Sequence, residues 1–354
     1  MNPNVRLALV GAIVLLLAAG AWLLTRERAA ERPQAAKQVW NYSVWGAPRA
    51  FTSGVERIAE IFKEASGGTF ELKIHYASSL SPEKENIDAI KIGTIEAAHV
   101  CFGYHPGKVP IVQVTELPFL LTDDVRINAR VLDAFFHHPF VERELAERWN
   151  LKYLALVLLP TFEFMGNKRI ARVEDLKGLR VRVLGGYGLT MQDLGAVPVM
   201  MTAPETYTAL ERGTMDVMAF PWTDSFGAFR IHEVSKFATE GLKIGGFACV
   251  SGISLGAWNA LPDSLKALLP RIQQEAIDTH LRAYEEADKK WLPIFRRRLE
   301  IVEFPASERA KLVRLSEPYW EQWAREMDRQ GQPGSQMLRF VKDEIEKARR
   351  EFGR

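Results

Sequence analysis

Short apolar runs alternate with amphipathic segments over most of the chain after residue 38. Apolar residues are continuous or recur at every second position in the runs, which is typical of β-strands, and they recur at the spacing of a helix face in the segments between them. The alternation predicts an α/β fold. The expected strands are 39–45, 70–76, 95–101, 151–158, 162–166 and 179–183, and the expected helices are 51–65, 82–92, two within 123–149, 187–194 and 204–213.

A much longer helical pattern runs from 263 to about 298, with apolar residues such as Leu265, Ile272 and Tyr284 on one face. A helix of ~36 residues would be about 54 Å long, which is more than one small lobe needs. Pro270 lies close enough to the start of this helix to be accommodated there. Two shorter amphipathic helices are expected after it, at 307–330 and 336–350.

The chain is long enough to form two lobes, with 354 residues of which 47% are hydrophobic and 25% are charged. The pair Pro160-Thr161, which follows the strand at 151–158, is the expected crossing between them. The expected division places 39–159 and 246–285 in lobe I, and 160–245 and 286–354, with the C-terminal helices, in lobe II.

The first residues have the pattern of an export segment. Arg6 precedes 18 residues without charge, 7–24, and the Ala-Gly-Ala sequence at 19–21 offers a cleavage site. The run is also just long enough to span a bilayer, so 1–24 is either a signal peptide or an N-terminal membrane anchor. Residues 25–38, rich in Arg, Glu and Ala, are expected to form a tether. In both cases the bulk of the chain lies beyond the membrane.

The formal net charge of +2 gives no long-range field that would attract nucleic acid. No stripe of basic and aromatic residues suggests a nucleic-acid surface either. The seven histidines include no His-Glu-x-x-His pattern and no cluster with cysteine. We therefore expect no nucleic-acid partner, no metal and no cofactor.

Two cysteines, Cys101 and Cys249, are too few for a disulfide scaffold or a thiolate zinc site. Two separate thiols are the favoured interpretation. A single bridge between them stays open, because spacing alone does not decide it.

The strand at 179–183 carries the clearest candidate for chemistry. Side chains alternate along a strand, so Val181 faces the core while Arg180 and Arg182 leave it on the same side. Arg182 stands near the carboxyl end of the strand, the edge of an open α/β sheet where ligands bind. A guanidinium binds a carboxylate through two parallel hydrogen bonds and stays charged when buried. Arg182 is therefore a candidate anion clamp, with a solvated surface arginine as the alternative.

Several motifs resemble, in the same order, those of the solute-binding proteins of tripartite ATP-independent periplasmic (TRAP) transporters. The match extends from about Trp40 to Leu265. The motifs are Gly103-Tyr104-His-Pro106-Gly107, Glu116-Leu-Pro118-Phe119, Asp175-Leu-Lys-Gly-Leu-Arg-Val-Arg-Val183, Gly195-Ala196-Val-Pro198-Val, and the segment 203–216 with Glu205, Tyr207, Leu210, Gly213 and Asp216.

The resemblance implies a two-lobed periplasmic-binding-protein-like fold with a hinge and a long helix that spans both lobes. It implies that Arg182 holds the carboxylate of a small organic acid in the cleft between the lobes. It also implies a periplasmic protein that delivers its ligand to a membrane permease with a small and a large subunit.

Aromatic side chains near strand ends are the other pocket candidates. If two lobes close over a cleft, side chains from several strand ends converge in it. Such a lining favours an organic acid with a flat or apolar body, or a quaternary ammonium group. Ordinary core packing is the competing interpretation for each of them. The candidates are Trp45, Phe102, Tyr104, Phe162, Tyr187, Phe220 and Trp222.

Two departures from the sialic-acid-binding members limit what the resemblance implies. Phe220-Pro221-Trp222 resembles a subgroup of the family, whereas the sialic-acid-binding members have an asparagine there that contacts the carboxylate. The region 162–164 lacks the second arginine of those members. The resemblance therefore implies one arginine clamp and argues against sialic acid.

The segment Gly252-Ile-Ser254-Leu-Gly256 matches the G-x-S-x-G pattern of serine hydrolases, in which a helix begins directly after the serine. Residues 257–262 instead resemble the family's turn into the long helix, so we expect no helix there and no enzyme. Two alternatives stay open: a substrate-binding protein of an ABC-type importer, and a membrane-tethered ligand sensor or hydrolase. The order of the motifs favours the TRAP family over both.

Overall fold

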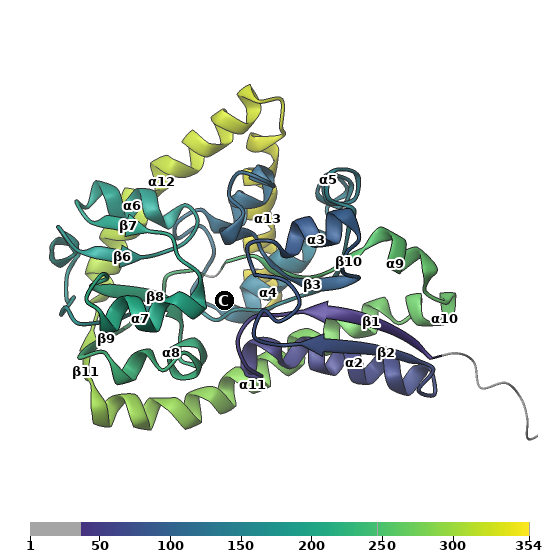
Figure 1. The fold of residues 1–354 in the computed structure, drawn as a ribbon. Helices are drawn as coiled ribbons and strands as arrows, with labels where there is room; N and C mark the ends of the chain where they lie inside the picture. The colour runs from purple at the N-terminus through teal and green to yellow at the C-terminus, as the bar shows by residue number, and fades with distance from the viewer. Residues whose placement is uncertain (1–36, 246, 354) are drawn as a thin grey trace, which may run out of the picture.

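Two β-sheets lie side by side in the computed structural model, which describes residues 37–245 and 247–353 (Figure 1). The first sheet runs in the order β2 (Phe70–His75), β1 (Gln38–Ser43), β3 (Ala97–Cys101), β10 (Cys249–Ser254) and β4 (Leu151–Leu156). The second runs in the order β11 (Glu300–Glu303), β9 (Phe237–Glu240), β5 (Phe162–Gly166), β8 (Val217–Pro221), β6 (Arg180–Arg182) and β7 (Val197–Val199). We call each sheet with its helices the first lobe and the second lobe.

Helices cover both sheets, so the expected α/β fold is confirmed (Figure 1). The α-helices are α2 (Ser53–Ala65), α3 (Asn86–Ile92), α4 (Val125–Phe136), α5 (Pro139–Trp149), α6 (Tyr187–Asp193), α7 (Thr206–Glu211), α8 (Asp224–Ala228), α9 (Leu255–Ala260), α10 (Asp263–Lys266), α11 (Leu269–Arg298), α12 (Ala306–Arg329) and α13 (Gly334–Glu351). Short 3-10 helices are η1 (Ala50–Thr52), η2 (Phe102–Tyr104), η3 (Pro110–Glu116), η4 (Val173–Leu176), η5 (Ala203–Glu205) and η6 (Ile231–Glu233).

The long helix α11 spans both lobes, as expected. It packs against α2 and β4 of the first lobe and against α8 and β11 of the second, and Figure 1 shows it in light green beneath both. Its expected start was wrong, because the residues from Asp263 form the separate helix α10 and α11 begins at Leu269. Pro270 has no N–H to give to the carbonyl of Lys266, so one helix cannot continue past it with its hydrogen bonds intact.

Other boundaries also differ from expectation. The helix expected at 82–92 begins only at Asn86, because a turn closed by the Glu85 N–H and the Pro82 carbonyl (2.9 Å) precedes it. The strand expected at 95–101 begins at Ala97. The short strands β7 to β11 are absent from the sequence-based expectation.

Two chain segments cross between the lobes side by side. One joins β4 to β5, and the other joins β9 to β10. The Phe162 N–H donates to the Ile244 carbonyl at 2.7 Å, and the Ile244 N–H donates back to the Phe162 carbonyl at 2.9 Å. At the other end, the Val157 N–H donates to the Cys249 carbonyl at 2.9 Å. This paired crossing, with α11, forms the hinge of the expected two-lobed fold.

Glu163 fastens one crossing segment to the second lobe. Its buried carboxylate accepts hydrogen bonds from the Thr239 hydroxyl (2.6 Å) and from the N–H groups of Gly241 (3.0 Å), Leu242 (3.2 Å) and Lys243 (3.0 Å). Gly241 and Lys243 have positive φ angles of 101° and 46°, so the backbone turns sharply there. The carboxylate satisfies backbone donors that such a turn leaves without strand partners.

The lobes each combine distant parts of the chain. β1 to β4 and β10 form the first sheet, and β5 to β9 and β11 form the second. The residue limits of the division expected from the sequence stay a prediction. Helix α13 packs against α12 and against α4 of the first lobe. The contact with α4 joins Leu338, Val341 and Ile345 to the same buried cluster as Leu132 and Phe135.

A disulfide joins Cys101 to Cys249, so the favoured interpretation of two separate thiols was wrong. The two residues face each other across the antiparallel pair of β3 and β10. They are 148 residues apart in the sequence, and their pairing is visible only once β10 is placed in the sheet.

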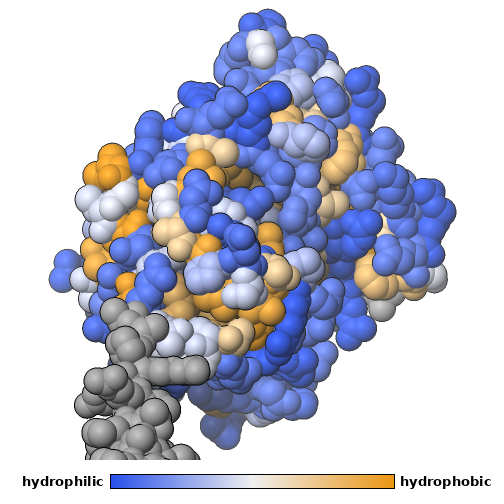
Figure 2. All heavy atoms as spheres, turned by 90° about the vertical axis from the view of Figure 1, so that its right-hand side faces the viewer, coloured by the Kyte–Doolittle hydropathy of each residue, from blue (hydrophilic) through white to orange (hydrophobic). Residues whose placement is uncertain are grey.

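The outer face of the molecule in Figure 2 is largely hydrophilic, with separate hydrophobic patches. Scattered exposed apolar residues are common on protein surfaces and do not mark a site by themselves. Among the described residues, no helix has the length and apolar character needed to cross a membrane. The signal peptide or anchor expected at 1–24 and most of the tether expected at 25–38 lie outside the described residues.

Removing the disulfide should destabilise the protein without unfolding the lobes. A cross-link that closes a loop of this length restricts the unfolded chain, and native disulfides typically stabilise by about 2–4 kcal/mol. We expect the Cys101→Ala, Cys249→Ala double variant to lose about that much free energy of unfolding, measured by urea denaturation. Dithiothreitol should lower the stability of the wild type and leave the variant unchanged. Equal stability of the two proteins under oxidising conditions would contradict the prediction.

Candidate functional site

The two arginines of β6 have different environments although they leave the strand on the same side. Arg180 is 43% exposed at its side chain and forms a two-pronged ion pair with Asp216, with N···O distances of 3.0 and 2.9 Å. Arg182 is only 1% exposed. β6 lies between β7 and β8 in the second sheet, and Arg182 is the last residue of the strand, at its carboxyl end. Arg180 is therefore the surface arginine, and Arg182 is the buried one.

The Arg182 guanidinium has only neutral partners among the described residues. Its Nε and Nη2 donate to the Met201 carbonyl at 3.2 and 3.1 Å, and its Nη1 donates to the Ala219 carbonyl at 2.8 Å. Nη2 also reaches the Tyr104 hydroxyl at 3.5 Å, and the guanidinium carbon lies 4.3 Å from the centre of the Phe220 ring. Burial lowers the pKa of Arg182, but an arginine stays protonated in proteins. The Glu205 carboxylate also attracts the Arg182 guanidinium, but it is hydrogen-bonded to Thr202 and forms no ion pair with the arginine. The site therefore holds a positive charge whose hydrogen bonds all go to neutral groups.

Arg182 lines a cavity between the two lobes. The cavity encloses about 40 Å³, whereas pockets for organic ligands usually measure about 300–1,000 Å³. In this conformation the cavity is therefore smaller than a typical site for an organic ligand. The lining residues are Trp45, Arg49, Phe51, Cys101, Gly103, Tyr104, Leu159, Phe162, Arg182, Leu184, Ala203, Phe220, Pro221, Ser225, Phe229, Phe247 and Cys249.

The structure brings five of the eight candidate residues together around this cavity. They come from both lobes: Trp45 and Tyr104 from the first, and Phe162, Arg182 and Phe220 from the second. The Trp45 and Tyr104 rings pack edge to face, with centroids 5.7 Å apart. Whether these side chains contact a ligand stays a prediction.

Trp222 lies outside the cavity lining. Its ring packs against Phe226 of α8 (5.9 Å between centroids) and Phe295 of α11 (5.5 Å). It is two residues beyond Phe220, but β8 ends at Pro221, so the alternation along the strand does not continue to Trp222.

Phe102 and Tyr187 also lie outside the lining. Phe102 follows β3 in a 3-10 turn and stacks on Phe136 of α4, with centroids 5.8 Å apart. Tyr187 opens α6, and its hydroxyl accepts a hydrogen bond from the Phe119 N–H at 3.3 Å. Both are fully buried among other side chains, so they support the walls of the cavity from behind.

Arg49 is a second guanidinium at the cavity, and sequence reasoning missed it. Its Nη1 donates to the carbonyls of Trp45 (2.9 Å) and Ala47 (3.0 Å), and its Nε lies 3.8 Å from Oδ2 of Asp224. Burial lowers the pKa of Arg49, and the nearby Asp224 raises it again. Arg49 follows β1 in the first lobe, and Asp224 opens α8 in the second, so the pair connects the lobes. The loop after the carboxyl end of β1 was the signal that pointed to it.

Glu116 is a buried acid behind the cavity wall. Burial raises the pKa of its carboxyl to about 8, an effect that a contact with the Gly103 backbone partly opposes. Neither carboxyl oxygen has a well-formed hydrogen bond within the described chain. A Cβ atom at Gly185 would lie 2.7 Å from Oε2 of Glu116, so only glycine lets the second lobe approach this closely. Because burial raises the pKa of Glu116 to about 8, its carboxyl is mostly protonated at neutral pH.

Ser254 does not have the setting of a nucleophile. Helix α9 begins directly after it, so the expectation of a turn without a helix was wrong. Its hydroxyl oxygen accepts a hydrogen bond from the Ala257 N–H at 3.2 Å and thereby caps the helix. Ser254 ends β10 at the opposite end from Cys249, about 17 Å from the cavity by strand geometry. Among the described residues, no group of three or more His, Cys, Asp or Glu could hold a metal ion.

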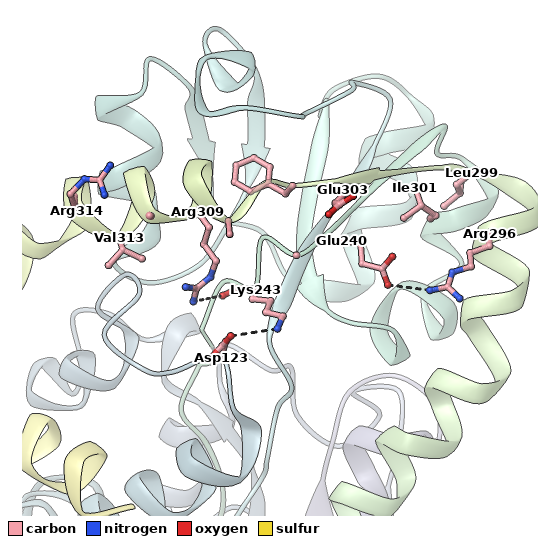
Figure 3. A pocket seen from close by; sticks show the side chains of 14 residues that line it. Asp123, Glu240, Lys243, Arg296, Leu299, Ile301, Glu303, Arg309, Val313 and Arg314 are labelled. Carbon is pink, nitrogen blue, oxygen red and sulfur yellow. Dashed lines mark hydrogen bonds and ion pairs between the residues drawn. The ribbon is translucent and has the colours of Figure 1, made fainter. Parts of the chain in front are cut away.

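A wider groove of about 1,070 Å³ lies elsewhere, between the crossing segments, α11 and α12 (Figure 3). Much of its charge is already paired. Lys243 lies 3.4 Å from Asp123, and Arg296 lies 3.3 Å from Glu240. Arg309 reaches the Lys243 carbonyl at 3.4 Å. Arg309 forms no ion pair among the described residues, but it is only half-buried, whereas Arg182 is almost completely buried.

A family model matches residues 43–326 of this chain, and the family is described as bacterial extracellular solute-binding protein, family 7. Among curated proteins, the monocarboxylate 2-oxoacid-binding periplasmic protein of Nostoc sp. is 28% identical over 240 residues. The alignment covers 66% of this chain and 64% of that relative, so the chain spans less than two thirds of the relative's length.

Two solved structures have closely similar folds. One is a TRAP periplasmic solute-binding protein from Desulfovibrio salexigens with bound orotic acid, with a TM-score of 0.79 and 22% identity, covering 88% of this chain and all (100%) of that chain. The other is a TRAP solute-binding protein from Rhodoferax ferrireducens in complex with copurified benzoate. It has a TM-score of 0.78 and 22% identity, and the match covers 88% of this chain and 98% of that chain. At this identity the likeness shows the fold.

Glu116 should make stability depend on pH. Its pKa is about 8 in the folded protein and near 4.5 in the unfolded chain, so between these values the unfolded state binds fewer protons and stability falls as pH rises. When the pH is raised from 5 to 8, the free energy of unfolding of the wild type should fall by up to about 4 kcal/mol more than that of the Glu116→Gln variant, measured by urea denaturation. Parallel stability curves for the two proteins would contradict a buried, protonated Glu116.

Proposed function

Because this chain belongs to the bacterial extracellular solute-binding proteins, family 7, we propose that it is the receptor of a TRAP-type transporter and captures a small organic monocarboxylate in the cavity at Arg182. The observation that carries this proposal is the buried guanidinium with only neutral partners in the described chain. A carboxylate offers the two oxygens that match its fork of donors. Exclusion of water would strengthen their attraction.

The balance of charge at the cavity supports a ligand with a single negative charge. Arg49 and Asp224 lie close enough to offset each other, and Arg182 adds a positive charge that has no carboxylate in direct contact, since Glu205 attracts it without forming an ion pair. Glu116 contributes none while it is protonated. A second carboxylate would be buried without a partner, which is strongly unfavourable. A quaternary ammonium ligand, which the aromatic lining alone would allow, would meet a cation of the same sign.

The aromatic lining supports a ligand with a flat or apolar body. Phe220 stacks on Phe229 with 15° between the ring planes, and Phe162 packs edge to face on Phe247. Rings of this kind contact planar or apolar ligands favourably. The similar proteins named above, described with benzoate, orotic acid and 2-oxoacids, bind small organic acids of this general kind.

Binding would involve motion of the lobes about the paired crossing segments. The cavity is too small for an organic acid, so the ligand would enter when the lobes are apart and be enclosed when they approach. Arg182 would bring the charge from the second lobe, and Trp45 and Tyr104 would close the first lobe over it. A ligand shifts this equilibrium only by its preference for the closed form.

The family supports a place outside the cytoplasm and a membrane permease as the partner that receives the ligand. The disulfide fits an oxidising compartment such as the periplasm. We propose that residues 1–24 direct the chain there. The similar structures are TRAP proteins, so the ABC-type importer has no observation in its favour.

A panel of acids should separate these ligand classes. Benzoate and branched aliphatic monocarboxylates should raise the melting temperature, whereas terephthalate, succinate and choline should not. A ligand at about 100 times its Kd stabilises by about 2.7 kcal/mol, which a thermal-shift assay resolves. A larger shift with terephthalate than with benzoate would contradict a singly charged ligand.

Truncation of Arg182 should abolish most of the affinity. We expect Arg182→Met to weaken binding of the best acid by about 2–5 kcal/mol in calorimetric titration, because the carboxylate would be buried without its partner. Arg182→Lys should recover only part of this loss, since an ammonium lacks the fork geometry.

The matched control is Arg180→Met, which removes the neighbouring guanidinium that pairs with Asp216 outside the cavity. It should bind the acid as the wild type does. Near-native affinity of Arg182→Met would remove Arg182 from the site.

A further inference from the structure

Two charged atoms beside the cavity lack the hydrogen bonds that buried atoms normally make. Nε of Arg49 and Oδ2 of Asp224 have no hydrogen-bond partner within the described chain. Their side chains are only 6% and 4% exposed. The two atoms face each other at 3.8 Å, which is too long for a hydrogen bond. Buried polar atoms are nearly always hydrogen-bonded, so this gap requires an explanation.

The gap persists because each side chain is held by its other atoms. Nη1 of Arg49 is bound to the carbonyls of Trp45 and Ala47. Oδ1 of Asp224 accepts a hydrogen bond from the Ala50 N–H at 3.2 Å, and the Phe51 backbone also interacts with this carboxylate. The partners belong to the turn that leads into α2, so the donor and the acceptor are fixed relative to each other. A group of suitable size and chemistry could bind to both.

The gap is connected to Arg182 along one wall of the cavity. The Arg182 guanidinium carbon lies 4.3 Å from the centre of the Phe220 ring, and that of Arg49 lies 5.1 Å from the centre of the Phe229 ring. The two rings stack on each other, with centroids 5.8 Å apart. Arg49 and Ser225 line the cavity, and Asp224, the residue before Ser225, lies directly behind this lining. A ligand that places its carboxylate on Arg182 can therefore extend along the ring pair toward Arg49.

We infer that Arg49 and Asp224 form a second polar subsite that receives a hydroxyl group of the ligand, which makes hydroxylated monocarboxylates the preferred class. A hydroxyl can accept from the Arg49 Nε–H and at the same time donate to Asp224 Oδ2. A ketone or ionised carboxylate only accepts, and an ammonium only donates, so each leaves one of the two atoms unsatisfied. A hydroxyl is also neutral and preserves the balance of charge at the cavity. The inference rests on the proposed capture of a monocarboxylate.

The advantage of the hydroxyl is limited by water. A water molecule is also both donor and acceptor and can bridge two polar groups almost as well as a direct contact. The hydroxyl group therefore improves the binding free energy over that of the parent acid by less than the cost of leaving a hydrogen bond unmade. Because the hydroxyl group bonds to charged groups, we expect the Kd of the hydroxy acid to be roughly 10-fold to 100-fold lower than that of its parent acid.

Calorimetric titration with matched pairs of acids tests the subsite. The pairs are benzoate with 3-hydroxybenzoate and 4-hydroxybenzoate, phenylacetate with 3-hydroxyphenylacetate, and propionate with lactate. In the wild type, at least one hydroxy acid should bind about 10-fold or more tightly than its parent. In the Arg49→Met, Asp224→Asn double variant, which removes both charges together, this ratio should fall to about one, whatever the change in the Kd of the parent acid itself.

Two further variants make the outcome unambiguous. Asp224→Asn alone weakens the acceptor, keeps the size of the side chain and should also lower the ratio, so the test does not depend on folding of the double variant. The control is the Arg57→Met, Glu275→Gln pair, which removes an ion pair of 2.6 Å between α2 and α11 outside the cavity lining. It should leave the ratio unchanged.

The results also separate this inference from the proposed function. If acids bind in an Arg182-dependent way but no hydroxy acid exceeds its parent, or the ratio survives in both Asp224 variants, the subsite is refuted and the proposed function stands. If no acid of any pair binds the wild type, the proposed function fails and the subsite fails with it.

Discussion

The burial of a guanidinium without a carboxylate in hydrogen-bond contact is the constraint on which the rest of the site depends. Arg182 has exchanged water for two backbone carbonyls, a phenol hydroxyl and the face of a phenylalanine ring. These partners satisfy its donors but leave its charge in surroundings of low polarity, where attraction to an anion is stronger than in water. Strands β6 and β8 hold the side chain in place, and the aromatic residues keep solvent away. The charge is therefore available only to a molecule that enters the cavity.

The same cavity couples the two lobes, because neither lobe completes it alone. The Tyr104 hydroxyl of the first lobe contacts the Arg182 guanidinium and accepts a hydrogen bond from the Ala203 N–H, both of the second lobe. Arg49 and Asp224 face each other across the same boundary. Glu116 lies against Gly185 close by, where only the absence of a side chain allows the approach. Polar and steric contacts between the lobes thus meet around the cavity, whose lining also includes Leu159 and Phe247 of the crossing segments.

The sequence predicts best what depends on local patterns. The strand at 162–166 and the helices of 123–149 follow from apolar spacing, and Arg182 follows from its place at a strand end together with the motif around it. Local patterns do not show which distant segments of the chain pair with each other. Cys101 meets Cys249, and Arg49 meets Asp224, only after β10 and α8 have been placed. Trp222 was expected in the cavity as an aromatic residue near a strand end, but the sequence does not show that its ring turns away to pack on α8 and α11.

Glu163 limits how the two halves of the molecule can swing. Because its carboxylate binds the backbone from Thr239 to Lys243, this stretch moves with the second sheet as one body. The crossing segments run antiparallel beside each other and are joined by the two hydrogen bonds between Phe162 and Ile244. Two segments joined in this way resist twisting about their common axis more than they resist bending across it. Closure of the lobes, as proposed above, would therefore follow a bend and would return the same side chains to the same neighbours each time.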